Sequence, residues 1–161
     1  MPTAHLICGP TGAGKTSYAI ALAARARAVI FSTEQWLAAL FAADAPEAPS
    51  LEWTLERIDR CEKQIEGAVT QILTAGASVV LDIGLPRADD RDRWRAHVAG
   101  TIAESKLHYL DVSREIRRTR VLGRKQLGRL DMTEALFERL EIRFEPPTDD
   151  ELYGAMILCE E

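Results

Sequence analysis

Cysteine, histidine and long apolar runs are scarce in this sequence, and each absence removes a class of protein. The three cysteines (Cys8, Cys61 and Cys159) form no Cys-x-x-Cys pair, and the three histidines show no metal-ligand spacing. Such sparse thiols are typical of a reducing compartment and of structural cysteines, which argues against a disulfide framework. The longest apolar run, 36–43, is too short to cross a bilayer.

The first residues also lack the basic and apolar segments of a secretory signal, and the chain has no internal repeat. A chain of 161 residues with 47% apolar and 28% charged residues has the composition of a globular domain. We therefore expect a single domain over 1–161, located in the cytoplasm. The net charge of −5 argues against a general nucleic-acid binder.

Positive charge is concentrated in one segment. Seven of the 20 basic residues but only one of the 25 acidic residues lie between Arg114 and Arg129. The remainder has 13 basic and 24 acidic residues, a net charge of −11. A basic segment within an acidic protein indicates one local function for positive charge.

Short apolar runs alternate with helical patterns along the chain. The expected strands are 5–8, 28–31, 78–84, 106–112 and 155–159. The expected helices are 16–26, 35–41, 51–75, 88–104, 113–128 and 133–144, the last one capped by Thr133. The proline-containing segments 42–50 and 145–151 are expected as a loop and a turn. This alternation predicts an α/β fold with a parallel sheet.

The most specific motif is "GPTGAGKT" at 9–16, which follows an apolar strand and precedes a helix. The spacing G-x-x-x-x-G-K-[ST] is that of a P-loop, in which glycines let backbone N–H groups point into one cavity and the helix adds its positive end. Lys15 is expected to reach the phosphates of ATP, and the Thr16 hydroxyl to hold Mg²⁺. The expected nucleotide-binding residues are Gly9, Pro10, Thr11, Gly12, Ala13, Gly14, Lys15, Thr16 and Ser17.

Asp82 ends the apolar run "SVVLD" and is a second candidate for the metal site. At the C-terminal end of a neighbouring strand it would lie beside the P-loop, where it could orient a water molecule bound to Mg²⁺. The alternative is a solvated carboxylate at a strand end. The P-loop favours the functional interpretation.

The basic segment is a candidate lid. On a helix, Arg117, Arg120 and Arg124 fall near one face. Guanidinium groups gathered in this way repel each other unless an anion joins them, and a phosphoryl group in transfer is such an anion. Arginines on a mobile lid would arrive with the substrate and exclude water. The alternatives are a solvated basic helix or a nucleic-acid contact.

Motifs of two other nucleotide-binding classes are missing. We find no Asn-Lys-x-Asp guanine reader, and a ring-forming motor would be longer and would carry a second acid beside the first at its strand end. Here Asp82 is followed by Ile83 and Gly84. The short length and the arginine cluster favour a kinase that acts on a small substrate.

The sequence resembles the small P-loop kinases, in particular the ATP-binding proteins often labelled AAA-family ATPases. These proteins are grouped with zeta toxins, chloramphenicol phosphotransferase and the kinase domain of phage polynucleotide kinase. The resemblance rests on "GPTGAGKTS" (9–17), "FSTEQW" (31–36), "VVLDIGLPRADDRDRWR" (79–95), "LDVSREIRRTRVLGR" (110–124) and "RFEPPTDDE" (143–151).

The resemblance implies a three-layer α/β/α fold whose five parallel strands have the order 2-3-1-4-5, with ATP at the C-terminal edge. It implies that Lys15 and Thr16 bind phosphates and Mg²⁺, and that Arg120 and Arg124 act from a short lid at about 113–130. It also implies a catalytic acid at the position of Glu34, where the look-alikes usually carry aspartate. The alternative places Glu34 in the first turn of a helix, facing the helix's positive end.

The acceptor side is expected over 36–60 and in the arginines that follow Asp82. Trp36 could stack on a flat ring or belong to the core. Arg87, Arg91 and Arg93 could hold an anionic acceptor or pair with neighbouring aspartates, and Arg117 is a further candidate contact. A nucleotide or oligonucleotide end, a sugar nucleotide, an antibiotic-like molecule and another metabolite all stay open as acceptors.

Two hypotheses for the function follow. The first is a Mg²⁺-dependent kinase that moves the γ-phosphoryl group of ATP to a hydroxyl of a small-molecule or nucleotide-type acceptor. The second is a nucleotide-binding regulatory or toxin–antitoxin partner protein with weak ATPase activity, whose basic helix docks on its partner.

Overall fold

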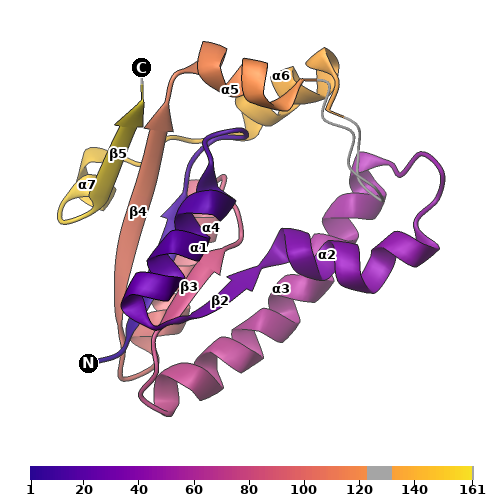
Figure 1. Ribbon diagram of the computed structural model, residues 1–161. Coiled ribbons are helices and arrows are strands. Elements are labelled where there is room, and N and C mark those ends of the chain that lie inside the picture. Colours follow the sequence, from indigo (N-terminus) through magenta and orange to yellow (C-terminus); the bar gives the residue numbers. More distant parts are fainter. Residues whose placement is uncertain (123–131, 161) are drawn as a thin grey trace.

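The computed structural model describes residues 1–122 and 132–160. Its strands are β1 (Thr3–Cys8), β2 (Val29–Ser32), β3 (Val79–Asp82), β4 (Glu104–Val112) and β5 (Met156–Glu160). All of the pairings are parallel, and the order is β2-β3-β1-β4-β5 (Figure 1). The parallel α/β fold predicted from the alternation is confirmed, as is the strand order implied by the resemblance.

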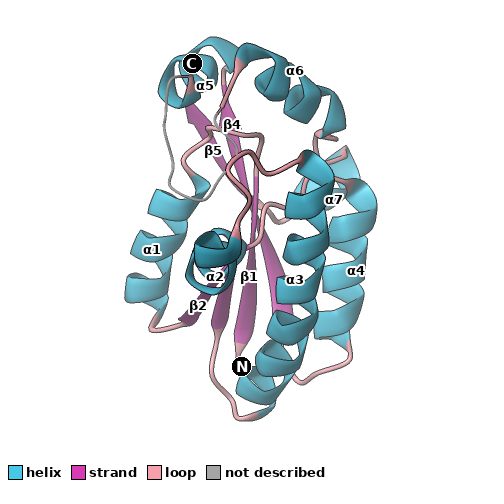
Figure 2. Ribbon diagram, turned by 90° about the vertical axis from the view of Figure 1, so that its right-hand side faces the viewer, coloured by secondary structure: helices cyan, strands magenta, loops and turns pink. Residues whose placement is uncertain are grey.

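Helices cover both faces of the sheet and one of its ends. They are α1 (Lys15–Ala26), α2 (Thr33–Phe41), α3 (Leu51–Thr74), α4 (Ala88–Ala99), α5 (Arg114–Val121), α6 (Glu134–Arg143) and α7 (Asp149–Leu152), with a 3₁₀ turn at Ala42–Asp44. In Figure 2, α1 lies on one face and α3 and α4 lie on the other. Helices α5 and α6 lie together beyond the end of β4 (Figure 1).

The alternation of buried side chains along the strands produces these two faces. On β1, Ala4, Leu6 and Cys8 pack into the core under α3 and α4, whereas Ile7 packs into the core under α1. Trp94 of α4 is fully buried in the first core. Because both faces are covered, the strands are apolar on both sides, as is typical of parallel sheets.

Several expected boundaries differ from the structure, among them that of the helix predicted over 113–128, which ends at Val121. The helix predicted over 88–104 ends at Ala99, because the chain turns at Gly100 and β4 already begins at Glu104. The turn predicted over 145–151 contains α7, which begins after Thr148 in a capping box with Glu151. Thr133 caps α6 as predicted, its side chain accepting the amide of Leu136.

Two of the three cysteines occupy the core positions that we expected, and the third does not. Cys8 and Cys61 are buried, while Cys159 is exposed on β5. Burial raises the pKa of Cys8 to about 11, so its thiol stays protonated. No helix within residues 1–122 or 132–160 combines the length and the apolar character that a membrane span requires.

Candidate active site

The P-loop connects β1 to α1 at the C-terminal edge of the sheet. Gly12 adopts a left-handed backbone with a φ of +82° and packs so closely that an added Cβ would lie 2.8 Å from the carbonyl oxygen of Arg117 and from Val121 Cγ1. Such contacts require glycine at this turn. Helix α1 then begins at Lys15, so its positive end faces the loop.

Lys15 is held inside the loop that it follows. Its Nζ donates to the carbonyl oxygens of Gly9 and Pro10, each at 2.9 Å. Desolvation lowers the pKa of Lys15, while the negative charges of Asp82 and Glu34 oppose that shift. The ammonium group is therefore held by the P-loop near Asp82 and Glu34 in the structure without phosphate.

Asp82 and Thr16 meet directly. The Thr16 Oγ1 hydroxyl donates to Asp82 Oδ2 at 2.7 Å, and the register pairs Asp82 with Ser32 of β2 at the same edge. Burial raises the pKa of Asp82, and the hydrogen bond from Thr16 acts in the opposite direction. These two oxygen donors fit Mg²⁺, which is usually held by few protein ligands and completed by phosphate and water.

Glu34 enters the site from the first turn of α2. The Ser32 side chain caps this helix by accepting the amide of Gln35, and Glu34 is exposed at the cavity wall. Its negative charge opposes the lowering of the Lys15 pKa and contributes to the raised pKa of Asp82, for which burial is the main cause. Beside it, Thr33 Oγ1 is buried and has no hydrogen-bond partner within the described part of the chain.

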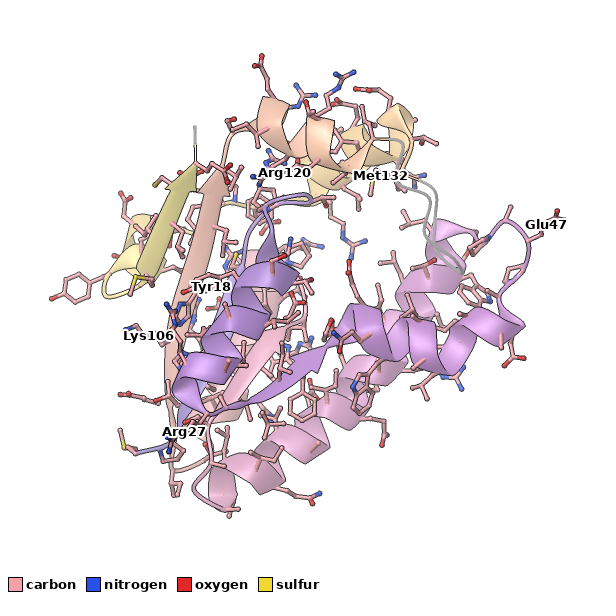
Figure 3. The ribbon with its side chains drawn as sticks, viewed as in Figure 1. Tyr18, Arg27, Glu47, Lys106, Arg120 and Met132 are labelled. Atoms are coloured by element: carbon pink, nitrogen blue, oxygen red, sulfur yellow. The ribbon has the colours of Figure 1, made fainter. Side chains whose placement is uncertain are left out.

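These residues surround a cavity of about 670 Å³, here called the nucleotide cavity. Figure 3 labels Arg120 at the end of α5 and Met132 just before α6, and both belong to the lining. The lining consists of Thr11, Gly12, Ala13, Gly14, Lys15, Thr16, Ser17, Thr33, Glu34, Leu37, Ile58, Asp82, Ile83, Gly84, Arg120, Val121, Met132 and Glu160. The volume is within the range of small-molecule sites in proteins.

A second cavity of about 540 Å³ adjoins the first, and it is called the acceptor cavity after the role that is proposed for it below. The two share Thr11, Lys15, Ile58, Ile83 and Gly84. The other lining residues of the acceptor cavity are Gly9, Pro10, Leu55, Asp59, Glu62, Leu85, Pro86, Asp90, Arg93, Leu140, Arg143 and Phe144. Lys15 therefore stands where the two spaces meet.

The family model described as an AAA domain matches residues 5–147. The chain belongs to this AAA-domain family. Among curated proteins, none matches the chain by sequence.

The solved structures that resemble this AAA-domain protein have the fold of the small P-loop kinases. A sugar kinase from Janibacter sp. HTCC2649 has a TM-score of 0.69 and 18% identity, covering 99% of this chain and 86% of its own. A candidate kinase from Chloroflexus aurantiacus has a TM-score of 0.76 and 20% identity, covering 98% and 86%. The APS kinase CysC of Mycobacterium tuberculosis, in complex with AMPPNP and APS, has a TM-score of 0.63 and 15% identity, covering 99% and 89%.

Two arginines predicted to contact the acceptor are buried in ion pairs of the AAA domain instead. Arg91 is fully buried, and its Nε and Nη2 donate to Glu151 at 2.7 and 3.0 Å. Arg117 is 5% exposed and is paired with Glu141. Since neither guanidinium group faces a cavity, the structure corrects their placement on the acceptor side.

Two other predicted acceptor contacts also lie outside both cavities. Arg87 is exposed and pairs with Glu145 at 3.4 Å, rather than with the neighbouring aspartates. Trp36 is partly buried and packs against the core, with its ring 6.1 Å from that of Phe31. This matches the core alternative that its sequence position left open.

The predicted arginine face separates into different environments. Arg117 lies behind the P-loop, whereas Arg120 lines the nucleotide cavity and pairs with Glu160 of β5 at 2.6 Å. Arg124 and the part of the predicted lid over 123–130 lie outside the described residues. The helical part of the predicted lid is α5.

Asp59 and Arg93, which belong to the predicted acceptor side, line the acceptor cavity, whereas Glu62, Asp90 and Arg143 were not predicted to lie there. Asp59 and Glu62 lie on the same face of α3 as Leu55 and Ile58, at helical spacing. This polar extension of an apolar stripe was the available signal. Arg143, at the end of α6, carried no signal, because nothing in its local sequence places α6 opposite α3.

Proposed function

We propose that this AAA-domain protein is a kinase that transfers the γ-phosphoryl group of ATP to a hydroxyl group of a small-molecule acceptor, with Mg²⁺ as the metal. The observation that carries the proposal is the pair of cavities that meet at Lys15. Hydrolysis of ATP needs only room for water, whereas transfer needs a second space on the far side of the γ-phosphate. The similar fold of named kinases supports this interpretation.

The roles of the residues follow from where they stand. The backbone amides of the P-loop and the Lys15 ammonium group would hold the phosphates. Arg120 would exchange its ion pair with Glu160 for the charge on the transferring group. Thr16 and Asp82 would hold Mg²⁺, which would supply positive charge beside the phosphates. Glu34 would accept the hydrogen bond of the attacking hydroxyl and orient it.

The acceptor cavity favours a particular kind of acceptor. Asp59, Glu62 and Asp90 offer carboxylate oxygens to hydroxyl groups and repel polyanions. Arg93 already binds Glu62 and Glu66 at 2.6 and 2.5 Å.

The side chain of Arg143 has no ion pair or hydrogen bond within residues 1–122 and 132–160, and it lines the acceptor cavity. Together with the three carboxylates, this favours a hydroxyl-rich acceptor with at most one negative charge over the end of a nucleic acid.

The alternative of a regulatory partner protein requires free positive charge on the basic helix. In the structure, Arg114 and Arg118 of α5 pair with Glu138 and Glu134 of α6. Arg117 and Arg120 are paired as well. Because acids of the same chain meet each of these charges, α5 has little charge left for docking on an acidic partner.

The test is ADP release from ATP and Mg²⁺, with and without a panel of hydroxyl-bearing acceptors that includes neutral, singly charged and nucleotide compounds. We expect acceptor-stimulated release that falls roughly 100-fold or more in Glu34→Gln, in line with the loss of a positioned acid or base. Lys15→Ala is expected to lose nucleotide binding. Nucleotide binding without stimulation by any acceptor would instead favour the regulatory protein.

Glu52→Gln is the matched control for Glu34→Gln. Glu52 is the second residue of α3, as Glu34 is of α2, and both helices have a serine cap, at Ser50 and Ser32. Glu52 lines neither cavity. If Glu34 only faced the positive end of its helix, the two variants would lose equal stability and neither would lose turnover.

A further inference from the structure

The guanidinium group of Arg117 is a buried junction of three elements. Its Nε donates to the Val112 carbonyl at the end of β4 at 2.8 Å, and its Nη1 donates to the Thr11 carbonyl of the P-loop at 3.2 Å. Nη1 and Nη2 also donate to the two carboxylate oxygens of Glu141 on α6, at 2.5 and 2.8 Å. All of its nitrogen atoms are thus engaged by the protein itself.

The contact with Thr11 bears on phosphate binding. A P-loop binds phosphate through amides that point inward, which turns carbonyl groups outward, where each needs a donor when it is buried. Arg117 supplies that donor at Thr11, and its own backbone packs against Gly12, whose Cβ would lie 2.8 Å from the Arg117 carbonyl oxygen. The tip of the P-loop therefore packs on α5 at Arg117 and Val121, and Arg117 supplies the hydrogen bond.

The contact with Glu141 bears on the acceptor cavity. Glu141 lies on α6 among residues that line the acceptor cavity. Leu140 precedes it, and Arg143 and Phe144 follow it at the end of the helix. A bidentate pair fixes the direction as well as the distance of the two groups. The same guanidinium group thus holds the P-loop on one side and the α6 wall of the acceptor cavity on the other.

We propose that Arg117 is a positioning residue that couples the conformation of the P-loop to the position of α6. When phosphate occupies the P-loop, the position of the Thr11 carbonyl becomes fixed. Through Arg117 and Glu141, the position of α6, which forms one wall of the acceptor cavity, becomes fixed as well. The proposal rests on the proposed function only in treating that wall as the acceptor side.

The neighbouring arginines provide a contrast. Arg118 also joins α5 to α6, through Glu134 at 2.6 Å, but both side chains are about half exposed and neither contacts the P-loop. Arg118→Gln therefore removes an α5–α6 ion pair without touching the proposed coupling. It is the matched control for variants of Arg117.

The experiment measures hydrogen exchange of 134–143 with and without Mg²⁺ and ADP, together with the affinity for ADP. In the wild type and in Arg118→Gln, we expect ADP to slow exchange in α6. In Arg117→Lys, which keeps the charge but not the fork geometry, the affinity should fall by about tenfold and the α6 response should disappear. In Glu141→Gln, the affinity for ADP should change by less than about threefold, because only one contact remote from the P-loop is altered. The slowing of α6 exchange by ADP should become weaker.

Glu141→Gln keeps the proposal testable if Arg117→Lys fails to fold. Arg117→Lys with wild-type affinity and a wild-type α6 response would overturn the coupling, as would a wild type in which ADP leaves α6 exchange unchanged. A purely structural Arg117 would lower the unfolding temperature equally with and without ADP and leave the response intact. A wild type that does not bind ADP would instead contradict the proposed function.

Discussion

Replacing Glu151 with glutamine removes the anion that faces the fully buried guanidinium group of Arg91. Arg91 is 0% exposed and Glu151 is 9% exposed at their side chains, and two hydrogen bonds of 2.7 and 3.0 Å join them. The hydrogen bonds from Arg91 are the main reason that the pKa of Glu151 falls from 4.5 to about 2. The charged pair is therefore a large local contribution to stability.

The magnitude follows from linkage. A depression of about 2.5 pKa units, at about 1.36 kcal/mol each, corresponds to roughly 3 kcal/mol, and solvent at the edge of Glu151 trims this to about 2–3 kcal/mol. Arg91 keeps the carbonyl groups of Glu145 and Leu85, at 2.9 and 3.3 Å, which limits the loss in Glu151→Gln. We expect the free energy of unfolding at pH 7 to fall by about 2–3 kcal/mol.

The sign of the pH dependence is also set. Because the folded pKa of Glu151 lies below its unfolded value, the pair contributes fully above pH 4.5 and its contribution is lost as the pH falls toward about 2. Urea unfolding followed by the fluorescence of the buried Trp94 measures this at several pH values. The wild type should lose more stability between pH 5.5 and 3 than Glu151→Gln does, by about 1–2 kcal/mol.

The control is Glu138→Gln, which breaks the exposed pair with Arg114 and should cost less than about 1 kcal/mol. Equal losses in the two variants at pH 7, with parallel acid limbs, would refute the reasoning. Such a result would mean that water reaches Arg91 and replaces the carboxylate.

Three further outcomes are expected. Gly12→Ala should weaken ATP binding by at least about tenfold in calorimetry, since the added Cβ would meet Arg117 and Val121 at 2.8 Å; unchanged affinity would show that α5 can yield. Asp82→Asn should lower Mg²⁺-dependent turnover about 100-fold while leaving Mg²⁺-free ATP binding within about threefold, and equal loss of both would place Asp82 outside the metal site. Arg143→Gln should raise KM about tenfold for singly charged acceptors and leave KM for neutral ones unchanged in steady-state assays, and a uniform rise would contradict the charge argument.

The sequence predicted the sheet well because its signals are local. The strand that ends at Asp82 and the P-loop at 9–16 are each readable in a short window, and parallel strands place such ends at one edge of the sheet. The position of Asp82 beside Thr16 therefore follows from sequence and topology together.

The arginines could not be placed in this way, because their partners are distant in sequence. Arg91 and Glu151 are 60 residues apart, and Arg117 and Glu141 are 24 residues apart. A local pattern shows that an arginine is charged, but not whether the fold places an acidic partner beside it. The full lining of the acceptor cavity could not be predicted for the same reason, since the P-loop, α3, the segment after β3, α4 and α6 all contribute residues to it.

The environment of the Lys15 side chain shows which costs of phosphate binding are already met when the chain folds. Its ammonium group is already stripped of much of its water and fixed on two carbonyl groups in the folded chain. The free-energy cost of ordering and desolvating this side chain therefore arises during folding. A phosphate that binds later meets a cation that is already in place. The same arrangement makes Lys15 a residue at which the protein gives up stability for affinity, so that a neutral side chain of similar length should yield a tighter fold that has lost its ligand.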